Sequence, residues 1–226
     1  MNWFEQLLNN RALETALPEA IWETVVMVGI SGIATVLIGG VIGIILHLTR
    51  PGGLAPMRVL YGFLSSIVVN ITRSVPYAIL MVALIPFTQW LVNTSIGPIA
   101  ATVSLTIATA PFFARLVETS LREVPTGTVD AAEVMGLSNG QIVTKVFLPE
   151  ALPGLIAATT NTIVVLIGYS AMAGLIGGGG LGRLAYNYGY QRFDSQIMIV
   201  TIVVIVIGVQ LIQWIGHKIV AAVDHR

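Results

Sequence analysis

The chain has 226 residues, of which 55% are hydrophobic and only 10% are charged. A soluble globular protein is about 25% charged, so the composition excludes that class and predicts an integral membrane protein. The 11 basic and 11 acidic side chains balance, which argues against a nucleic-acid partner. There are no cysteines and the three histidines are scattered, so we expect no disulfide, no cysteine nucleophile and no metal site.

The first 19 residues mix apolar and polar side chains at helical spacing. Trp3, Phe4 and Leu7 lie among polar residues, a pattern typical of an amphipathic helix at a membrane interface. The segment has no positively charged start and no cleavage-like site, which argues against a removable signal peptide. We therefore expect residues 1–19 to form an extracytoplasmic interfacial helix before the first span.

The remainder of the chain contains long stretches without charge. A membrane helix needs roughly 20 apolar residues to cross the hydrocarbon core. The sequence accordingly predicts an all-α membrane protein with five transmembrane helices, and residues 20–226 are expected to form one transmembrane domain. The expected bounds of the spans are 20–48, 59–92, 98–121, 151–175 and 195–217.

The basic residues indicate the orientation, because loops that face the cytoplasm carry the excess of lysine and arginine. The larger set, on one side, is Arg50, Arg58, Arg115, Arg122, Lys145, Lys218 and Arg226; the smaller set, on the other, is Arg11, Arg183 and Arg192. We therefore predict the N-terminus outside and the C-terminus inside. A hairpin of two crossings within 59–92 is the alternative, and it would weaken this bias.

The second span is too long for one straight helix and contains a proline. Pro76 lacks a backbone donor and disfavours helix at the preceding residue. Backbone groups freed at membrane depth need partners within the protein or in a water-filled cavity. We predict a break near 73–76, with Arg73, Ser74 and Pro76 at the gate of a pathway. The alternative is a simple kink from which Arg73 reaches the interface.

Arg115 and Glu118 lie one helical turn apart near the end of the third span. This spacing predicts an intrahelical ion pair. The alternative is part of a proton relay in a secondary transporter, which would need further acids buried in the spans. We expect no other acid to be buried there, so the ion pair is favoured.

The one large polar loop, residues 122–150, lies on the predicted cytoplasmic side. Its sequence predicts a short helix that begins near Thr126 and stops at Gly136, then a second helix over about 139–148. The short helix would expose small and apolar side chains such as Met135. An exposed apolar face of this kind indicates a docking partner.

The pattern in this loop resembles the EAA signature of the membrane permeases of bacterial ABC importers. Asp130-Ala131-Ala132 is followed after three residues by Gly136 and, after nine more, by Val146-Phe147-Leu148-Pro149. The spacing agrees in full, with Asp130 in place of glutamate and Val146 in place of isoleucine. The resemblance implies an ABC type I importer permease fold and a loop that couples the chain to a separate ATPase. The residues it implies for coupling are Asp130, Ala131, Ala132, Glu133, Met135, Gly136, Leu137, Leu148 and Pro149.

Other segments are similar to the permeases of methionine importers, and the resemblance extends over about residues 17–226. These segments are 72–76, 85–88, 177–182 and 188–193. The resemblance implies a homodimeric subunit in the bacterial inner membrane that moves L- or D-methionine by alternating access. Its implied partners are two ATP-binding subunits, an extracytoplasmic methionine-binding protein and membrane lipid. Tyr190, Gln191 and Arg192 are the candidates for contact with the binding protein, and packing against the neighbouring loop is the alternative for them. An importer of another amino acid or small organic solute is the alternative.

The chain itself is expected to be no enzyme and to hold no cofactor, since ATP and Mg would be bound by the partner. Neither Lys145 nor Lys218 lies in a phosphate loop of the form G-x-x-x-x-G-K-[ST]. The glycine run at 177–180 is expected to form a flexible loop at the extracytoplasmic mouth. A channel, a secondary transporter and an intramembrane enzyme are the rival classes, and the spans lack the acids or Ser/His sets that they need.

Overall fold

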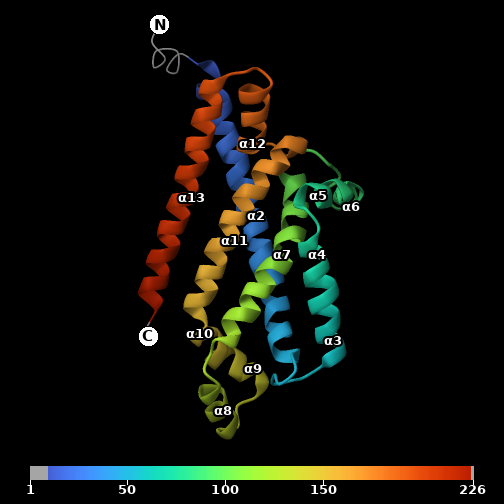
Figure 1. Ribbon diagram of the computed structural model, residues 1–226, viewed down its shortest axis with the longest axis vertical. Helices are drawn as coiled ribbons and strands as arrows, with labels where there is room; N and C mark the ends of the chain where they lie inside the picture. The colour runs from blue at the N-terminus through green and yellow to red at the C-terminus, as the bar shows by residue number, and fades with distance from the viewer. Residues whose placement is uncertain (1–9, 225–226) are drawn as a thin grey trace. The chain divides into compact units, whose positions relative to one another are not determined.

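The computed structural model describes residues 10–224, with only the backbone of Arg11. Within these residues every regular element is a helix and no strand occurs, as Figure 1 shows. The expectation of an all-α protein is confirmed.

Four long helices carry the most apolar parts of the sequence. They are α2 (Arg11–Thr49), α7 (Pro98–Arg122), α11 (Leu152–Ala173) and α13 (Ser195–Val223). Each is able to cross a membrane by length and composition, and the bent pair Arg58–Ser74 and Tyr77–Ala83 makes a fifth span if it is counted once. A helix satisfies its backbone hydrogen bonds internally, which is what the hydrocarbon core requires. The prediction of five spans agrees with this structure when the bent pair is counted as one span.

The first helix begins earlier than we expected. α2 runs without interruption from Arg11 through Pro18 and on to Thr49, so residues 11–19 continue into the first span and do not form a separate interfacial helix. The side chains of Leu13 and Leu17 pack against a core cluster around Leu181 and Ile197, which keeps these turns in line with the span. Trp3, Phe4 and the rest of residues 1–9 lie outside the described residues.

The second span is interrupted where the proline predicts it. Its segments are α3 (Arg58–Gly62), the π-helical η1 (Phe63–Ile71), α4 (Thr72–Ser74), α5 (Tyr77–Ala83) and α6 (Ile85–Val92). Val75 and Pro76 between them are extended, with ψ of 125° and 133°. The helix is interrupted a second time at Leu84. Residues 59–92 therefore form three helical segments and not one helix with a single break.

The large polar loop is helical throughout most of its length. Its elements are α8 (Thr126–Val134), α9 (Asn139–Ile142), the π-helical η2 (Val143–Phe147) and α10 (Leu148–Glu150). Both predicted helices of this loop are therefore present, and the second continues as far as Glu150.

The described residues fall into two compact units, to each of which α2, α7, α11 and α13 contribute. The first unit comprises 10–33, Pro76–Ile107 and Ile163–Ile212, and the second comprises Ala34–Val75, Ala108–Thr162 and 213–224.

The first unit contains a tightly packed glycine turn. Here η3 (Gly174–Gly178) is followed by α12 (Gly180–Leu184) and η4 (Ala185–Tyr190). Gly174, Gly178, Gly180 and Gly182 are all buried. A Cβ added at Gly182 would collide with the Ala171 backbone, and one at Gly174 would lie 2.5 Å from the Arg183 nitrogen. The run that we expected to form an open loop is thus a close-packed turn.

The second unit has its main core where α7 meets the polar loop. Phe113, Val117 and Leu121 of α7 share one buried cluster with Ile142 and Phe147 of the loop. In the same unit α2 approaches α7 closely, and the Thr35 and Thr109 hydroxyl oxygens are 2.7 Å apart in a hydrogen bond. The end of α7 and the loop that follows it therefore form one packed body.

Candidate functional site

The short helix α8 ends in a Schellman motif. Gly136 has a left-handed φ of 77°. Its N–H donates to Glu133 O at 2.9 Å, and the Leu137 N–H donates to Ala132 O at 3.1 Å. These two bonds satisfy carbonyls that the end of a helix leaves without partners. Because a residue with a Cβ disfavours this φ, the turn that closes α8 requires glycine.

The two faces of α8 have opposite environments. Ala132 is 1% exposed and belongs to the core of the second unit. On the other side, Val134 is 89% exposed and Met135 is 71% exposed, and the carboxylates of Asp130 and Glu133 lie on the same exposed surface. The structure therefore offers a partner an apolar patch with acidic neighbours.

Ala132 departs from the expectation that the short helix exposes its small side chains. Its small side chain faces the protein's own core, together with the half-buried Val129 and Leu137. The three-residue step from Val129 to Ala132 places both on one helix face, and that face is covered. Ala131 is exposed, as expected.

The second helix of the loop is held by a capping box. The Ser138 hydroxyl accepts from the Gln141 N–H, while the Gln141 side chain accepts from the Ser138 N–H at 2.9 Å. Ser138 is thus the N-cap of α9. Further along, Leu148 is half-buried and Pro149 is exposed in α10. Neither belongs to α8, so they do not share its exposed face.

Phe147 ties the loop to the first helix. Its ring meets the ring of His47 edge-on, with centroids 4.5 Å apart. His47 is buried at the end of α2. No local sequence pattern predicts this contact, because the two residues are far apart in the chain.

A charged cluster occupies the end of α7. The predicted ion pair is present, with Arg115 Nη1 and Glu118 Oε2 2.5 Å apart. Arg122 Nη2 lies 2.5 Å from the other carboxylate oxygen of Glu118, and the Tyr61 hydroxyl donates to that oxygen at 3.3 Å. Sequence reasoning missed Arg122 and Tyr61 as partners, although the four-residue spacing of Glu118 and Arg122 was a readable signal.

The predicted gate residues flank the break in the second span. The Ser74 hydroxyl donates to Asn70 O at 2.8 Å, which supplies the carbonyl with a partner before the helix ends. The Arg73 guanidinium lies 5.7 Å from the centre of the Phe112 ring, a cation–π distance. Pro76 then precedes α5 as its N-cap residue.

Comparison with known proteins identifies the family to which this architecture belongs. Residues 39–225 match the family described as binding-protein-dependent transport system inner membrane component. The chain belongs to this family of transporter permeases. The prediction of an ABC importer permease, made from the EAA pattern, is confirmed.

Full-length relatives support this assignment of the permease. It is 50% identical over 224 residues to the probable D-methionine transport system permease protein of Vibrio cholerae, covering 99% of this chain and 96% of that one. It is 51% identical over 158 residues to the D-methionine permease of Escherichia coli K12, covering 70% and 72% of the two chains.

Solved structures agree with the same fold. The permease superimposes on a chain of the MetNI methionine ABC transporter, in inward-facing conformations, with a TM-score of 0.93 and 47% identity over 96% of this chain and all of that one. A structure titled an amino acid ABC transporter with histidines has a TM-score of 0.78 at 16% identity, over 98% and 99% of the two chains. This second likeness shows the fold alone.

The outer segment predicted to contact a binding protein is exposed in the permease. Tyr190, Gln191 and Arg192 all lie at the surface. The Arg192 guanidinium lies 4.3 Å from the centre of the Tyr188 ring. Phe193 is 85% exposed and has a left-handed φ of 55°, an uncommon conformation for a bulky residue. The segment thus presents aromatic and cationic groups together.

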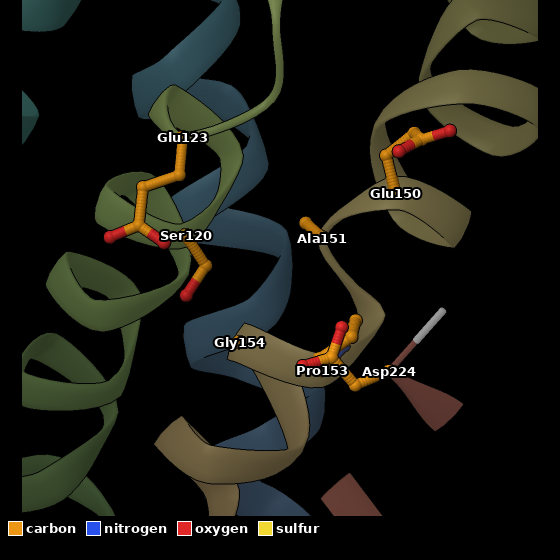
Figure 2. A pocket seen from close by; sticks show the side chains of 7 residues that line it. All are labelled: Ser120, Glu123, Glu150, Ala151, Pro153, Gly154 and Asp224. Carbon is orange, nitrogen blue, oxygen red and sulfur yellow. The ribbon is translucent and has the colours of Figure 1, made fainter. Parts of the chain in front are cut away.

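A small acidic recess of about 130 Å³ lies in the second unit of the permease, as Figure 2 shows. It is lined by Ser120, Glu123, Glu150, Ala151, Pro153, Gly154 and Asp224. Its carboxylates come from separate elements of the unit. Among residues 10–224 no group of three His, Cys, Asp or Glu side chains is placed to hold a metal ion. The recess is therefore a depression lined by three carboxyl groups, those of Glu123, Glu150 and Asp224.

Proposed function

We propose that this chain is the membrane permease subunit of an ATP-driven importer of methionine. The observation that carries the proposal is the 50% identity, over 99% of the chain, to a permease named for D-methionine transport. The likeness extends far beyond the loop that reports a partner ATPase, and so includes whatever residues select the cargo. The TM-score of 0.93 to the methionine transporter supports the same conclusion.

ATP hydrolysis belongs to a separate subunit in this proposal. The chain has two lysines, Lys145 and Lys218, and neither follows a glycine-rich phosphate loop. The surface that we assign to the ATPase is the exposed side of α8, where Val134 and Met135 form an apolar centre. Interfaces are commonly built from an apolar centre and a polar rim, and Asp130 and Glu133 supply acidic groups for that rim.

The other predicted coupling residues have supporting roles in this assignment. Ala131 lies on the docking side, while Gly136 and Leu137 form the turn that closes α8. The buried Ala132 side chain anchors α8 to the core of the second unit. Leu148 and Pro149 form the base from which the loop returns to the membrane.

The complex that we propose contains two copies of this chain, two ATPase subunits and an extracytoplasmic binding protein. Each copy offers one coupling loop, so a two-fold dimer presents two loops to two ATPases. In this complex the N-terminus of the chain is outside and the C-terminus is inside. The surface formed by Tyr190, Gln191 and Arg192 is assigned to contact with the binding protein. Closure of the ATPases would drive alternating access, and Arg73, Ser74 and Pro76 are placed near the moving gate.

Reconstitution tests this proposal directly. The purified chain, its candidate ATPase and its candidate binding protein are placed in proteoliposomes, and uptake of radiolabelled methionine is followed with and without ATP. We expect uptake that needs ATP and all three components. Uptake without the ATPase would overturn the importer mechanism.

The cargo is tested separately from the mechanism. An importer of another amino acid or small solute is the second candidate, because the same fold at 16% identity serves a transporter whose title names histidines. Competition with unlabelled L- and D-methionine against other amino acids separates the two. ATPase stimulation by a binding protein loaded with a different solute, with no methionine uptake, would keep the permease and replace its cargo.

A further inference from the structure

Glu118 is a buried charge with a complete set of partners. Its side chain is 1% exposed, while those of Arg115 and Arg122 are 25% and 43% exposed. Each carboxylate oxygen accepts from one of the arginines, and the Tyr61 hydroxyl joins at 3.3 Å. A buried carboxylate is tolerated only when it is paired and hydrogen-bonded, so this arrangement fixes the two guanidinium groups in place.

The cluster reaches from α7 to the helical run before the break in the second span. Arg115 Nη2 donates to Ser65 Oγ at 2.9 Å and to Asn70 Oδ1 at 3.1 Å. Arg122 Nη2 also donates to the Tyr61 hydroxyl at 3.2 Å. Tyr61, Ser65 and Asn70 lie on successive turns of the run from Arg58 to Ser74. The α7 charges therefore contact this run at three levels.

Apolar and cation–π contacts also attach that run to the rest of the second unit. Val69 shares a small buried cluster with Leu46 and Ala114, against which Tyr61 and Leu64 pack, and Arg73 lies over the Phe112 ring. The opposite side exposes a stripe of large apolar residues at four-residue spacing, namely Val59, Phe63, Ile67 and Ile71. The polar contacts from Arg115 and Arg122 add to these and join the run to α7 at specific positions.

The other end of this connection is the coupling loop. Glu118 lies one helical turn before the end of α7 at Arg122. Leu121 and Val124, which follow it, are buried in the same core as Ala132 of α8. Close-packed groups move together because cores deform little. A force applied to α8 is thus carried to Glu118.

We propose that the Arg115–Glu118–Arg122 cluster, through Tyr61, Ser65 and Asn70, is the mechanical link that transmits movement of the coupling loop to the broken second span. The proposal rests on the proposed function, because it requires an ATPase that moves the loop. The three charged residues act as positioning residues. They hold two helices in one body and contact no substrate.

The sharpest test removes two of the three contact levels of this link while leaving Glu118 paired within α7. The double variant Ser65→Ala with Asn70→Ala removes both acceptors of the Arg115 Nη2 group. The matched control is Ser66→Ala, which makes the same change at the exposed neighbouring position. Methionine uptake and ATP hydrolysis are measured in the same proteoliposomes, and their ratio is the readout.

We expect the double variant to hydrolyse ATP at the normal rate and to move less methionine. Residues that carry coupling between sites shift equilibria by amounts that correspond to roughly twofold to thirtyfold, and uptake per ATP is expected to fall within that range. Ser66→Ala is expected to leave the ratio unchanged. An unchanged ratio in the double variant overturns the proposal, and so does loss of the assembled complex, since that indicates a merely structural role.

A second variant shows whether Arg115 acts through these contacts. Arg115→Lys keeps a positive charge for Glu118 but has no guanidinium fork to reach two partners at once. We expect it to lower uptake per ATP in the otherwise unchanged chain and to add nothing to Ser65→Ala with Asn70→Ala. Additive losses would contradict the link. If methionine is not the cargo, the ratio is measured with the solute that is transported, so failure of the cargo assignment and failure of the link are distinguishable.

Discussion

The Glu23 carboxylate of α2 accepts a hydrogen bond from the backbone N–H of Gly180 at 2.6 Å, across 157 residues of sequence. Thr24 Oγ1 accepts from the next N–H, that of Leu181, at 2.9 Å. The Arg183 guanidinium lies 3.1 Å from the same Glu23 carboxylate. The first N–H groups of a helix have no partner within it, and here α2 supplies the partners for α12. The glycine turn is thereby held against the first helix.

Removal of this carboxylate is expected to destabilise the first unit. Glu23→Ala leaves the Gly180 N–H without its acceptor and removes the nearer carboxylate of Arg183, and an unsatisfied buried donor costs about 1–3 kcal/mol. Thermal unfolding of the purified protein in detergent micelles measures the loss. The control is Glu19→Ala, because Glu19 is 67% exposed and 4.0 Å from Arg183, a pair worth about 0–1 kcal/mol. Equal melting temperatures for the two variants would contradict this role for Glu23.

The features that the sequence predicted well depend on neighbouring residues. The third span was expected over 98–121 and α7 is Pro98–Arg122, because the proline at its start and the long apolar stretch that follows are neighbours in the sequence. The break at Pro76 follows from the missing donor of one residue. The same holds for the glycine stop at Gly136, which is set by signals within one turn.

The features that it did not predict depend on packing between distant segments. Alternation and spacing identify Ala132 as a small residue on a helix face, but not which partner covers that face. The glycine run at 177–180 has the composition of a flexible loop, and only the approach of α2 shows that it is close-packed. Glu118 was paired correctly with Arg115, yet the hydrogen bond from Arg115 to Ser65 joins two helices and no local pattern encodes it.

The two faces of α8 are expected to respond differently to substitution. Val134→Ser removes an exposed apolar side chain, so it should weaken ATPase binding by more than about 1 kcal/mol, or roughly fivefold, and leave the melting temperature unchanged. Ala132→Leu overfills the core and should cost about 1–3 kcal/mol of stability. Affinity for the purified ATPase and thermal unfolding are measured for both. A Val134→Ser variant that binds the ATPase normally would exclude this face as the docking surface.

Substitutions in the turn after α8 separate the effect of backbone conformation from the effect of steric crowding. A Cβ at Gly136 would meet no atom within 4 Å, yet its φ is 77°. Gly136→Ala is therefore expected to cost about 1–2 kcal/mol through the left-handed conformation alone. Gly136→Asn should cost less, since asparagine adopts this conformation more readily. Gly140→Ala, also without close neighbours but with no positive φ, is the control and should be neutral or stabilising. Hydrogen exchange of the loop amides measures the effect, and equal exchange in all three variants would refute it.

The close approach of α2 to α7 predicts that alanine substitutions at two nearby glycines change the stability of the protein in opposite directions. A Cβ at Gly43 would lie 2.6 Å from the Ala114 carbonyl oxygen and 2.6 Å from Val117 Cβ, whereas one at Gly40 would be 3.9 Å from Phe113. Small residues let membrane helices pack backbone to backbone, so Gly43→Ala forces the helices apart and should cost about 1–3 kcal/mol. Gly40→Ala has room for its methyl group and removes a flexible residue from a helix interior, which should add about 0.5–1 kcal/mol. Thermal unfolding in detergent reports both changes. Because the substitutions are chemically identical and three residues apart, a gain in stability at Gly43 would show that the two helices do not meet there.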